Sequence, residues 1–201
     1  MNVQTTPLSG ILIIEPRVFN DSRGYFYEAW NESTFLEQGI GGHFVQDNQS
    51  KSSYGVIRGL HYQLNPYAQA KLIRALEGSI LDVVVDIRKD SPTHGQHYSL
   101  ELSAGNHRQL YIPAGFAHGF SVLSPTATIL YKCDHPYNKE SEAGIRFDDP
   151  VELGREREQF VVPPCFRQSL AGDGRHQPRR DARRRDRFAP VDQQEIEAAP
   201  V

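Results

Sequence analysis

A succession of short strand-like segments, separated by turn signals, is the feature that most constrains the fold of this chain. The segments are rich in β-branched and aromatic residues, whereas Gly, Pro, Asp and Ser gather between them. One helix is expected over Glu32–Gln38, with Asn31 as its N-cap and Gly39 as its stop. So many strands with so little helix predict an all-β antiparallel sandwich or barrel. The expected strands are Ile11–Ile14, Tyr25–Trp30, Phe44–Gln49, Val56–Gln63, Lys71–Leu76, Ile80–Ile87, Tyr98–Leu102, Arg108–Ile112, Phe120–Leu123 and Thr128–Lys132.

Two local motifs narrow this class to one architecture. Gly59-Leu60-His61-Tyr62-Gln63, followed by Glu77-Gly78, resembles the first cupin motif, with Gln63 where metal-binding cupins place a second His. Pro113-Ala114-Gly115-Phe116-Ala117-His118 fits the second motif, Pro-x-Gly-x-x-His. Their order on strand-rich sequence predicts a cupin-type antiparallel jelly-roll barrel.

The composition changes near residue 151. Residues 152–201 contain ten arginines and nine acidic residues, but no Lys, Tyr or Trp. Large apolar residues are sparse there, so the segment cannot bury enough apolar surface to offset its ordering entropy. We therefore expect a folded domain over residues 1–151 and a disordered Arg-rich tail over 152–201.

Charge and composition exclude several classes of partner. No apolar run approaches the roughly 18 residues of a membrane span, and Cys133 and Cys165 are too few for a disulfide scaffold. The net charge of −3 argues against a nucleic-acid binder. The acidic residues of the tail also leave its arginines little net field. We expect neither a nucleic-acid nor a membrane partner.

Ionisable side chains lie on strands that should line an apolar interior. His61, Lys71, Asp82 and Tyr131 each sit on a different expected strand, and His118 lies two residues before another, in segments otherwise rich in strand formers. Solvent-facing alternation or structural hydrogen bonding would explain each one singly. We prefer the interpretation that these residues share one pocket, although the sequence alone does not show that they lie close together in the fold.

The chemistry of such a pocket follows from its residue types. Histidine accepts protons near neutral pH and Tyr donates them, while Lys stabilises an enolate and Arg holds phosphate. The set suits proton abstraction beside a carbonyl in a phosphorylated substrate, without a metal or redox cofactor. Arg58 is separated from His61 by three positions, so strict alternation places it on the opposite face unless a β-bulge intervenes.

Six separated segments carry a resemblance to the dTDP-4-dehydrorhamnose 3,5-epimerase family over residues 9 to 150. The resemblance implies C3 and C5 epimerisation of a dTDP-4-dehydro-6-deoxy sugar by a cytoplasmic homodimer that uses no cofactor. The segments are Asp21-Ser22-Arg23-Gly24-Tyr25-Phe26, Phe44-Val45-Gln46-Asp47-Asn48, Ile57-Arg58-Gly59-Leu60-His61-Tyr62-Gln63, Asp86-Ile87-Arg88-Lys89-Asp90-Ser91-Pro92-Thr93, Ile112-Pro113-Ala114-Gly115-Phe116-Ala117-His118-Gly119-Phe120 and Leu130-Tyr131-Lys132.

The resemblance also implies a role for each site residue. His61 is the base and Tyr131 the acid on the opposite face of the sugar, whereas Lys71 stabilises the enolate and Asp82 orients its surroundings. Tyr137 lies near the site and is the second candidate for the acid. The implied substrate-binding residues are Arg23 and Arg58 for the diphosphate, together with Glu28, Gln46, Asn48, His118 and Glu142.

The family's pattern breaks after Pro150. In other members of the family the pattern continues with an Ile-x-Trp-Pro-like segment and then Ser-x-Lys-Asp. The resemblance implies that this Asp orients the catalytic His. Neither segment follows Pro150 in this sequence. The break coincides with the change in composition. We therefore expect that the native C-terminal segment has been replaced, most simply through a reading-frame shift, and that turnover is slowed or folding impaired.

Three other functions fit parts of the sequence. A related enzyme that epimerises only C3 or only C5 would share almost all of these segments. A metal cupin could use His61 and His118, although Gln63 replaces the second His of the motif. An inactive chain could serve as a sugar-nucleotide-binding module.

Overall fold

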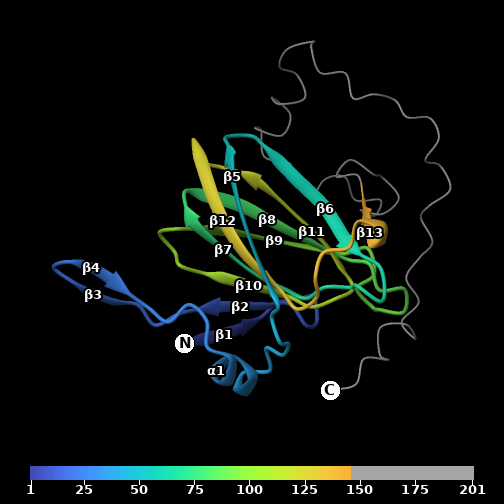
Figure 1. Cartoon of the computed structure of the whole chain (residues 1–201), viewed down its shortest axis with the longest axis horizontal. Coiled ribbons are helices and arrows are strands. Elements are labelled where there is room, and N and C mark those ends of the chain that lie inside the picture. The colour runs from blue at the N-terminus through green and yellow to red at the C-terminus, as the bar shows by residue number, and fades with distance from the viewer. Residues whose placement is uncertain (146–201) are drawn as a thin grey trace, which may run out of the picture.

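Two antiparallel sheets face each other in the computed structural model, which describes residues 1–145 (Figure 1). One sheet has six strands in the order β1-β2-β10-β7-β12-β5, and the other has five in the order β13-β6-β11-β8-β9. The chain crosses repeatedly between the sheets, as in a jelly roll. The all-β cupin-type prediction is therefore confirmed. The expected domain end at residue 151 and the expected tail lie outside the described residues.

The strands of the two sheets are short, as the turn signals predict. The six-stranded sheet contains β1 (Asn2–Thr5), β2 (Leu12–Glu15), β5 (Gln46–Ser53), β7 (Lys71–Glu77), β10 (Gln109–Ile112) and β12 (Thr126–Cys133). The five-stranded sheet contains β6 (Ile57–Gln63), β8 (Ser79–Asp86), β9 (His97–Ser103), β11 (Phe116–Val122) and β13 (Glu142–Gly144). A separate hairpin pairs β3 (Phe19–Asp21) with β4 (Gly24–Phe26).

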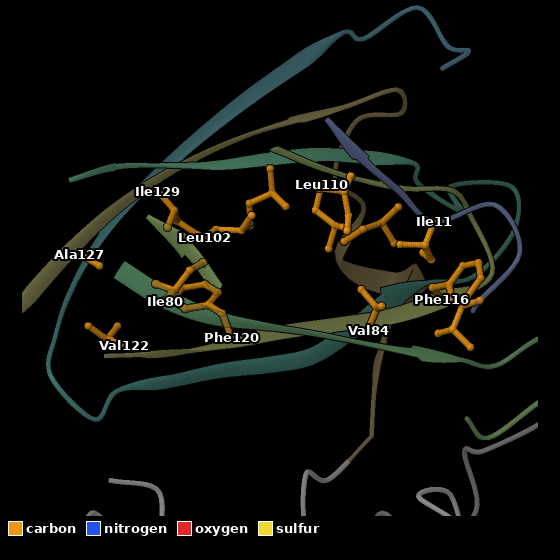
Figure 2. Packing of buried hydrophobic residues seen from close by; sticks show 14 residues of the cluster. Ile11, Ile80, Val84, Leu102, Leu110, Phe116, Phe120, Val122, Ala127 and Ile129 are labelled. Atoms are coloured by element: carbon orange, nitrogen blue, oxygen red, sulfur yellow. The ribbon is translucent and has the colours of Figure 1, made fainter. Parts of the chain in front are cut away.

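The main core fills the space between the two sheets. Side chains such as Ile80 and Phe120 from one sheet meet Ile129 from the other (Figure 2). Because successive side chains on a strand point to opposite faces, β11 places Phe120 in this core while Ala117 packs on the outer face of the sheet. The burial of these apolar side chains supplies the main driving force for the sandwich.

The expected helix is present as α1 (Glu32–Glu37). The side chain of Asn31 accepts the Thr34 N–H as the N-cap, and Gly39 follows with φ +75°, so both predicted ends are confirmed. Phe35 is buried and its ring lies 4.6 Å from that of Trp30. This cluster covers part of the outer face of the six-stranded sheet. None of the helices within residues 1–145 is long and apolar enough to span a membrane.

The strand predicted over Tyr25–Trp30 is wrong beyond Phe26. The chain leaves β4 there because Trp30 turns back to pack against Phe35 and Phe44. The same packing delays the predicted strand at Phe44, so that β5 begins at Gln46. Three strands, β1, β3 and β13, were not predicted, because each is only three or four residues long and lacks a clear alternation.

A buried carboxylate organises the turn after β8. The Asp86 side chain is inaccessible to solvent and accepts hydrogen bonds from Arg88 at 2.7 and 2.9 Å, from Thr93 at 2.6 Å and from Ser91. Burial alone would raise the pKa of Asp86, but these hydrogen bonds outweigh it and lower the pKa from 3.8 to about 2. The ionised form is thus favoured in the folded state.

We predict that Asp86→Asn lowers the free energy of unfolding by about 2 kcal/mol at pH 7. Because the folded pKa is depressed, this stabilisation is fully present above pH 3.8 and is lost as the pH falls through about 2. Urea denaturation at pH 7 and at several values below 4 should show the two proteins converging. Asp90→Asn, an exposed acid of the same turn, is the control. A deficit that does not shrink with falling pH would contradict the prediction.

Candidate active site

The site is built on an irregularity between β6 and β11. His118 pairs with His61 and Phe120 pairs with Arg58, so that β6 gains one residue over this interval. The extra residue is a β-bulge, and it returns Arg58 to the inner face that His61 occupies. The β-bulge, which the sequence alone did not decide, is therefore present.

Gly59 makes this bulge possible. Its φ is +114°, and a Cβ atom built on it would lie 2.5 Å from the Cα of Gly119 and 2.6 Å from the carbonyl oxygen of His118. Any larger residue would push β6 and β11 apart. The inward placement of Arg58 and His61 thus depends on a position that only glycine can occupy.

A cavity of about 640 Å³ opens between the two sheets at this point. Most of the predicted site residues meet there, although they come from strands far apart in the sequence. The predicted residues that line the cavity are Gln46, Asn48, Arg58, His61, Lys71, His118, Tyr131, Tyr137 and Glu142.

The strand pairing explains how these residues are distributed. Gln46 and Asn48 alternate along the inner face of β5, while Tyr131 lies on β12 and Lys71 begins β7, all in the six-stranded sheet. His61, by contrast, lies on β6 of the five-stranded sheet. The cavity therefore has His61 on one wall and Tyr131 on the facing wall.

Asp82 lies behind the cavity rather than on its surface. It is fully buried on β8, and its Oδ2 atom is 2.9 Å from Nε2 of His118. Its Oδ1 atom has no hydrogen-bond partner within residues 1–145. Asp82 thus contacts His118 directly, whereas it raises the pKa of Lys71 only through its charge.

Two predicted binding residues are not brought to this cavity. Arg23 lies at the turn of the β3–β4 hairpin, which projects away from the sheets (Figure 1). Its side chain is 88% exposed and pairs with Asp21 at 2.6 Å. Glu28 accepts a hydrogen bond from the Asn31 side chain at 3.1 Å and does not line the cavity.

His61, Glu142 and Tyr137 form a connected group at the rim of the cavity. Nδ1 of His61 is 3.1 Å from Oε1 of Glu142, and the hydroxyl of Tyr137 donates to Oε2 of the same carboxylate at 2.9 Å. The backbone N–H of Tyr137 donates to the Gln46 side chain at 2.9 Å. This last contact ties the loop after β12 to β5.

Burial and nearby charges shift the pKa of three side chains on the six-stranded sheet, Lys71, Tyr131 and Cys133. Burial lowers the pKa of Lys71 below its ordinary 10.5, and the charges of Cys133, Asp82 and Glu142 oppose that shift. Burial raises the pKa of Tyr131 above 10.0, and that of Cys133 to about 11. At neutral pH Tyr131 therefore keeps its proton, and Cys133 is an uncharged neighbour of Lys71.

The side chain of Gln63 holds a loop in place. Its Oε1 atom accepts the backbone N–H of Asn138 at 2.8 Å, which fixes the loop leading to η1 (Lys139–Ser141) and β13. His118 is engaged by Asp82. Residues 1–145 contain no group of three or more His, Cys, Asp or Glu side chains arranged to hold a metal ion.

The sequence interpretation missed two polar residues that line the cavity, Ser50 and Gln69. Ser50 continues the alternation of Gln46 and Asn48 on β5, so the period of the strand could have identified it. Gln69 lies in a loop before β7 and donates to the His135 carbonyl at 2.7 Å. No sequence pattern marks that position.

This fold and cavity define a cupin-type barrel whose site holds a candidate base, His61, and a candidate acid, Tyr131, on facing walls. Residues 5–161 match the family model of dTDP-4-dehydrorhamnose 3,5-epimerase. The chain belongs to that family.

Individual relatives agree with this assignment. The dTDP-4-dehydrorhamnose 3,5-epimerase of Shigella flexneri is 54% identical over 151 residues, which cover 74% of this chain and 83% of that protein. A crystal structure of the dTDP-6-deoxy-D-glucose-3,5-epimerase of Legionella pneumophila Philadelphia 1, in complex with dTDP-4-keto-L-rhamnose, is similar with a TM-score of 0.73. It is 48% identical and the match covers 76% of this chain and 80% of that one.

A more distant relative has a different specificity. A 3'-monoepimerase from Streptomyces bikiniensis, solved in complex with dTDP-quinovose, is 30% identical with a TM-score of 0.68. The match covers 82% of this chain and 85% of that one.

Proposed function

We propose that this chain epimerises dTDP-4-dehydro-6-deoxy-D-glucose at C3 and C5 to give dTDP-4-dehydro-L-rhamnose. The observation that carries the proposal is the placement of His61 and Tyr131 on facing walls of one cavity. Inversion of a carbon centre requires a proton to leave one face of the sugar and another to arrive on the opposite face. The similarity to the Shigella and Legionella epimerases supports the same substrate.

The reaction begins with His61 as the base. It takes the proton from C3 or C5, both of which are adjacent to the C4 ketone, and the electrons of the broken C–H bond move to the C4 oxygen as an enolate. Lys71 stabilises the negative charge on that oxygen. Tyr131 then donates its proton to the opposite face of the same carbon, and exchange with solvent restores both residues. The proposed chemistry needs neither a metal nor a redox cofactor.

Tyr131 suits the acid role better than Tyr137. The hydroxyl of Tyr137 already donates to the Glu142 carboxylate, and this hydrogen bond is the main reason that the pKa of Tyr137 is raised. The hydroxyl of Tyr131 makes no hydrogen bond that the structure records within residues 1–145. It is therefore available to a substrate.

Arg58 is the diphosphate-binding residue of the cavity itself. Its Nε donates to Ser52 at 3.0 Å, which fixes the guanidinium while leaving the terminal nitrogens for a ligand. Gln46, Asn48 and His118 line the same cavity and complete the proposed contacts to the substrate. A charged nucleotide sugar does not cross membranes unaided, which agrees with a cytoplasmic location.

We predict that both centres exchange when the reaction runs in deuterated water. NMR of the product should show deuterium at C3 and C5, because the Tyr131 hydroxyl exchanges with the solvent and then delivers a deuteron to each carbon. His61→Asn should lower the rate of both exchanges by roughly 10²–10⁴-fold. His43→Asn, which alters an exposed histidine outside the cavity, is the control.

The same experiment separates the competing functions. Deuterium at only one of the two carbons would indicate a single-centre epimerase, as in the Streptomyces bikiniensis relative. Binding of the substrate without any exchange would indicate an inactive sugar-nucleotide-binding chain. Either outcome would contradict the proposed double epimerisation.

We predict an alkaline limit to kcat that is set by Lys71. Because the pKa of Lys71 is depressed, the charge that stabilises the enolate is lost as the pH rises, at a pH below 10.5. The raised pKa of Tyr131 places loss of its proton above pH 10.0. Arginine stays protonated throughout, so Lys71→Arg should move the alkaline limit upward. Lys51→Arg, at an exposed lysine paired with Glu77, is the control, and an unchanged limit in Lys71→Arg would contradict the assignment.

We further propose that the chain acts as a homodimer in which Arg23 and Glu28 serve the partner's cavity. Neither residue reaches the cavity of its own chain. The β3–β4 hairpin exposes three aromatic side chains, Phe19, Tyr25 and Phe26, the last with 69% of its surface accessible. Exposed apolar surface of this kind is typical of an interaction site. A second copy would cover these rings and place Arg23 beside a diphosphate.

We predict that two inactive variants restore each other's activity when mixed. In a dimer of Arg23→Ala with His61→Asn, one of the two sites receives intact copies of both residues. Random exchange of subunits should therefore recover about a quarter of wild-type activity. The control pair is Arg58→Ala with His61→Asn, which alter the same cavity and leave no intact site in any dimer. An absence of rescue in the first pair, with exchange of subunits verified, would contradict the shared site.

A further inference from the structure

We propose that Glu142 is the positioning residue that orients His61 for proton abstraction. The inference rests on the proposed function and deepens it, because it gives a distinct role to a residue that the resemblance describes only as a substrate contact. Its basis is the group formed by His61, Glu142 and Tyr137 at the rim of the cavity.

The contact with Glu142 determines which nitrogen of His61 carries the proton. An ionised carboxylate only accepts hydrogen bonds. Oε1 of Glu142 lies 3.1 Å from Nδ1 of His61, so this contact requires the proton of the neutral imidazole to sit on Nδ1. Nε2 is then left with a free lone pair. Glu142 thereby selects the tautomer in which Nε2 is the basic atom.

The carboxylate is itself held in place from the other side. Oε2 accepts the hydroxyl proton of Tyr137 at 2.9 Å, and the Tyr137 backbone N–H is bound to Gln46, whose side-chain amide donates to Asn48 at 2.9 Å. Both oxygens of Glu142 therefore have fixed partners. A carboxylate restrained in this way can fix the ring that it contacts.

Strand pairing brings the two residues together. β13 pairs with β6 so that Glu142 is opposite Gln63 and Gly144 is opposite His61. The approach is close at Gly144, because a Cβ atom built there would lie 2.9 Å from the carbonyl oxygen of Leu60 and 3.9 Å from Cδ2 of His61. A larger residue at that position would press on the strand beside the imidazole. The geometry of β13 thus serves the placement of Glu142 beside His61.

Orientation, rather than stability, is the expected contribution of this pair. The side chains of His61 and Glu142 are 58% and 38% exposed, and ion pairs with that exposure stabilise a fold very little. A bound sugar excludes water from the rim, and interactions between charged groups there become stronger. The pair is therefore most effective when substrate is present.

The position of Glu142 also bears on the C-terminal segment of the family's pattern that this sequence lacks. A general base works best when a third group fixes its orientation. The Ser-x-Lys-Asp segment that supplies this group by resemblance does not follow Pro150 in this sequence. Glu142 provides a carboxylate on Nδ1 from within residues 1–145. With Glu142 in this role we expect turnover without that segment, whereas the break in the sequence pattern alone led us to expect slowed turnover or impaired folding.

The test compares Glu142→Gln with Glu140→Gln, an exposed acid in the same short segment that does not line the cavity. Glutamine keeps the size of Glu142 but can donate as well as accept, so it no longer selects one tautomer. We expect kcat for Glu142→Gln to fall on the order of 10- to 100-fold, while the Kd for dTDP stays within about twofold. Glu140→Gln should match the wild type in both measurements.

Nitrogen-15 NMR of His61 supplies a readout that a structural role would not change. The wild type and Glu140→Gln should show His61 protonated at Nδ1, whereas Glu142→Gln should show a mixture of tautomers. Protonation at Nε2 in the wild type, or a loss in Glu142→Gln that is confined to KM and Kd with kcat unchanged, would overturn the inference. Because the tautomer is measured without substrate, failure of the epimerase proposal in the deuterium experiment is distinguishable from failure of this one.

Discussion

The close passage of β6 over β11 is the constraint on which the rest of the site depends. Gly59 and Gly119 bring the two backbones so near that a single added carbon would collide with the neighbouring chain. The resulting bulge turns both Arg58 and His61 toward the interior, although regular alternation would separate them. One backbone irregularity thus places Arg58 and His61, the proposed diphosphate ligand and the proposed base, in the same cavity, and the regular strands around it hold them there.

The carboxylates in and behind the cavity are engaged by separate partners. Asp82 is engaged by His118, and Glu142 by His61 and Tyr137, so neither carboxylate forms a direct ion pair with Lys71. Cys133, next to Lys71 across the strand pair, is uncharged at neutral pH. Within residues 1–145 the ammonium group of Lys71 is therefore left without a carboxylate partner, as the proposed stabilisation of an enolate requires. A permanent partner would compete with the enolate for it.

Most of the longer strands and several inward-facing residues were predictable because they follow from alternation and from motifs that the sequence shows directly. His61, Lys71 and Tyr131 are examples, and all three line one cavity, whereas Asp82 lies behind it. The side of the sheet that Arg58 occupies was not predictable, since a bulge depends on the neighbouring strand. Nor could the sequence place Glu142 beside His61, because β13 is only three residues long and its pairing with β6 defines it. The position of Arg23 outside its own cavity likewise depends on where a hairpin points.

The hydrogen bond between Gln63 and the backbone of Asn138 has a consequence for how readily this barrel could change its chemistry. In metal-binding cupins the corresponding position supplies a ligand, but here it tethers the loop that carries Tyr137 and leads to Glu142 on β13. Replacing Gln63 with histidine to recruit a metal would remove the amide oxygen that restrains this loop. A protein engineer who seeks a metalloenzyme on this scaffold would therefore have to rebuild the support of the loop together with the new ligand. The two kinds of cupin chemistry are separated here by linked changes rather than by one substitution.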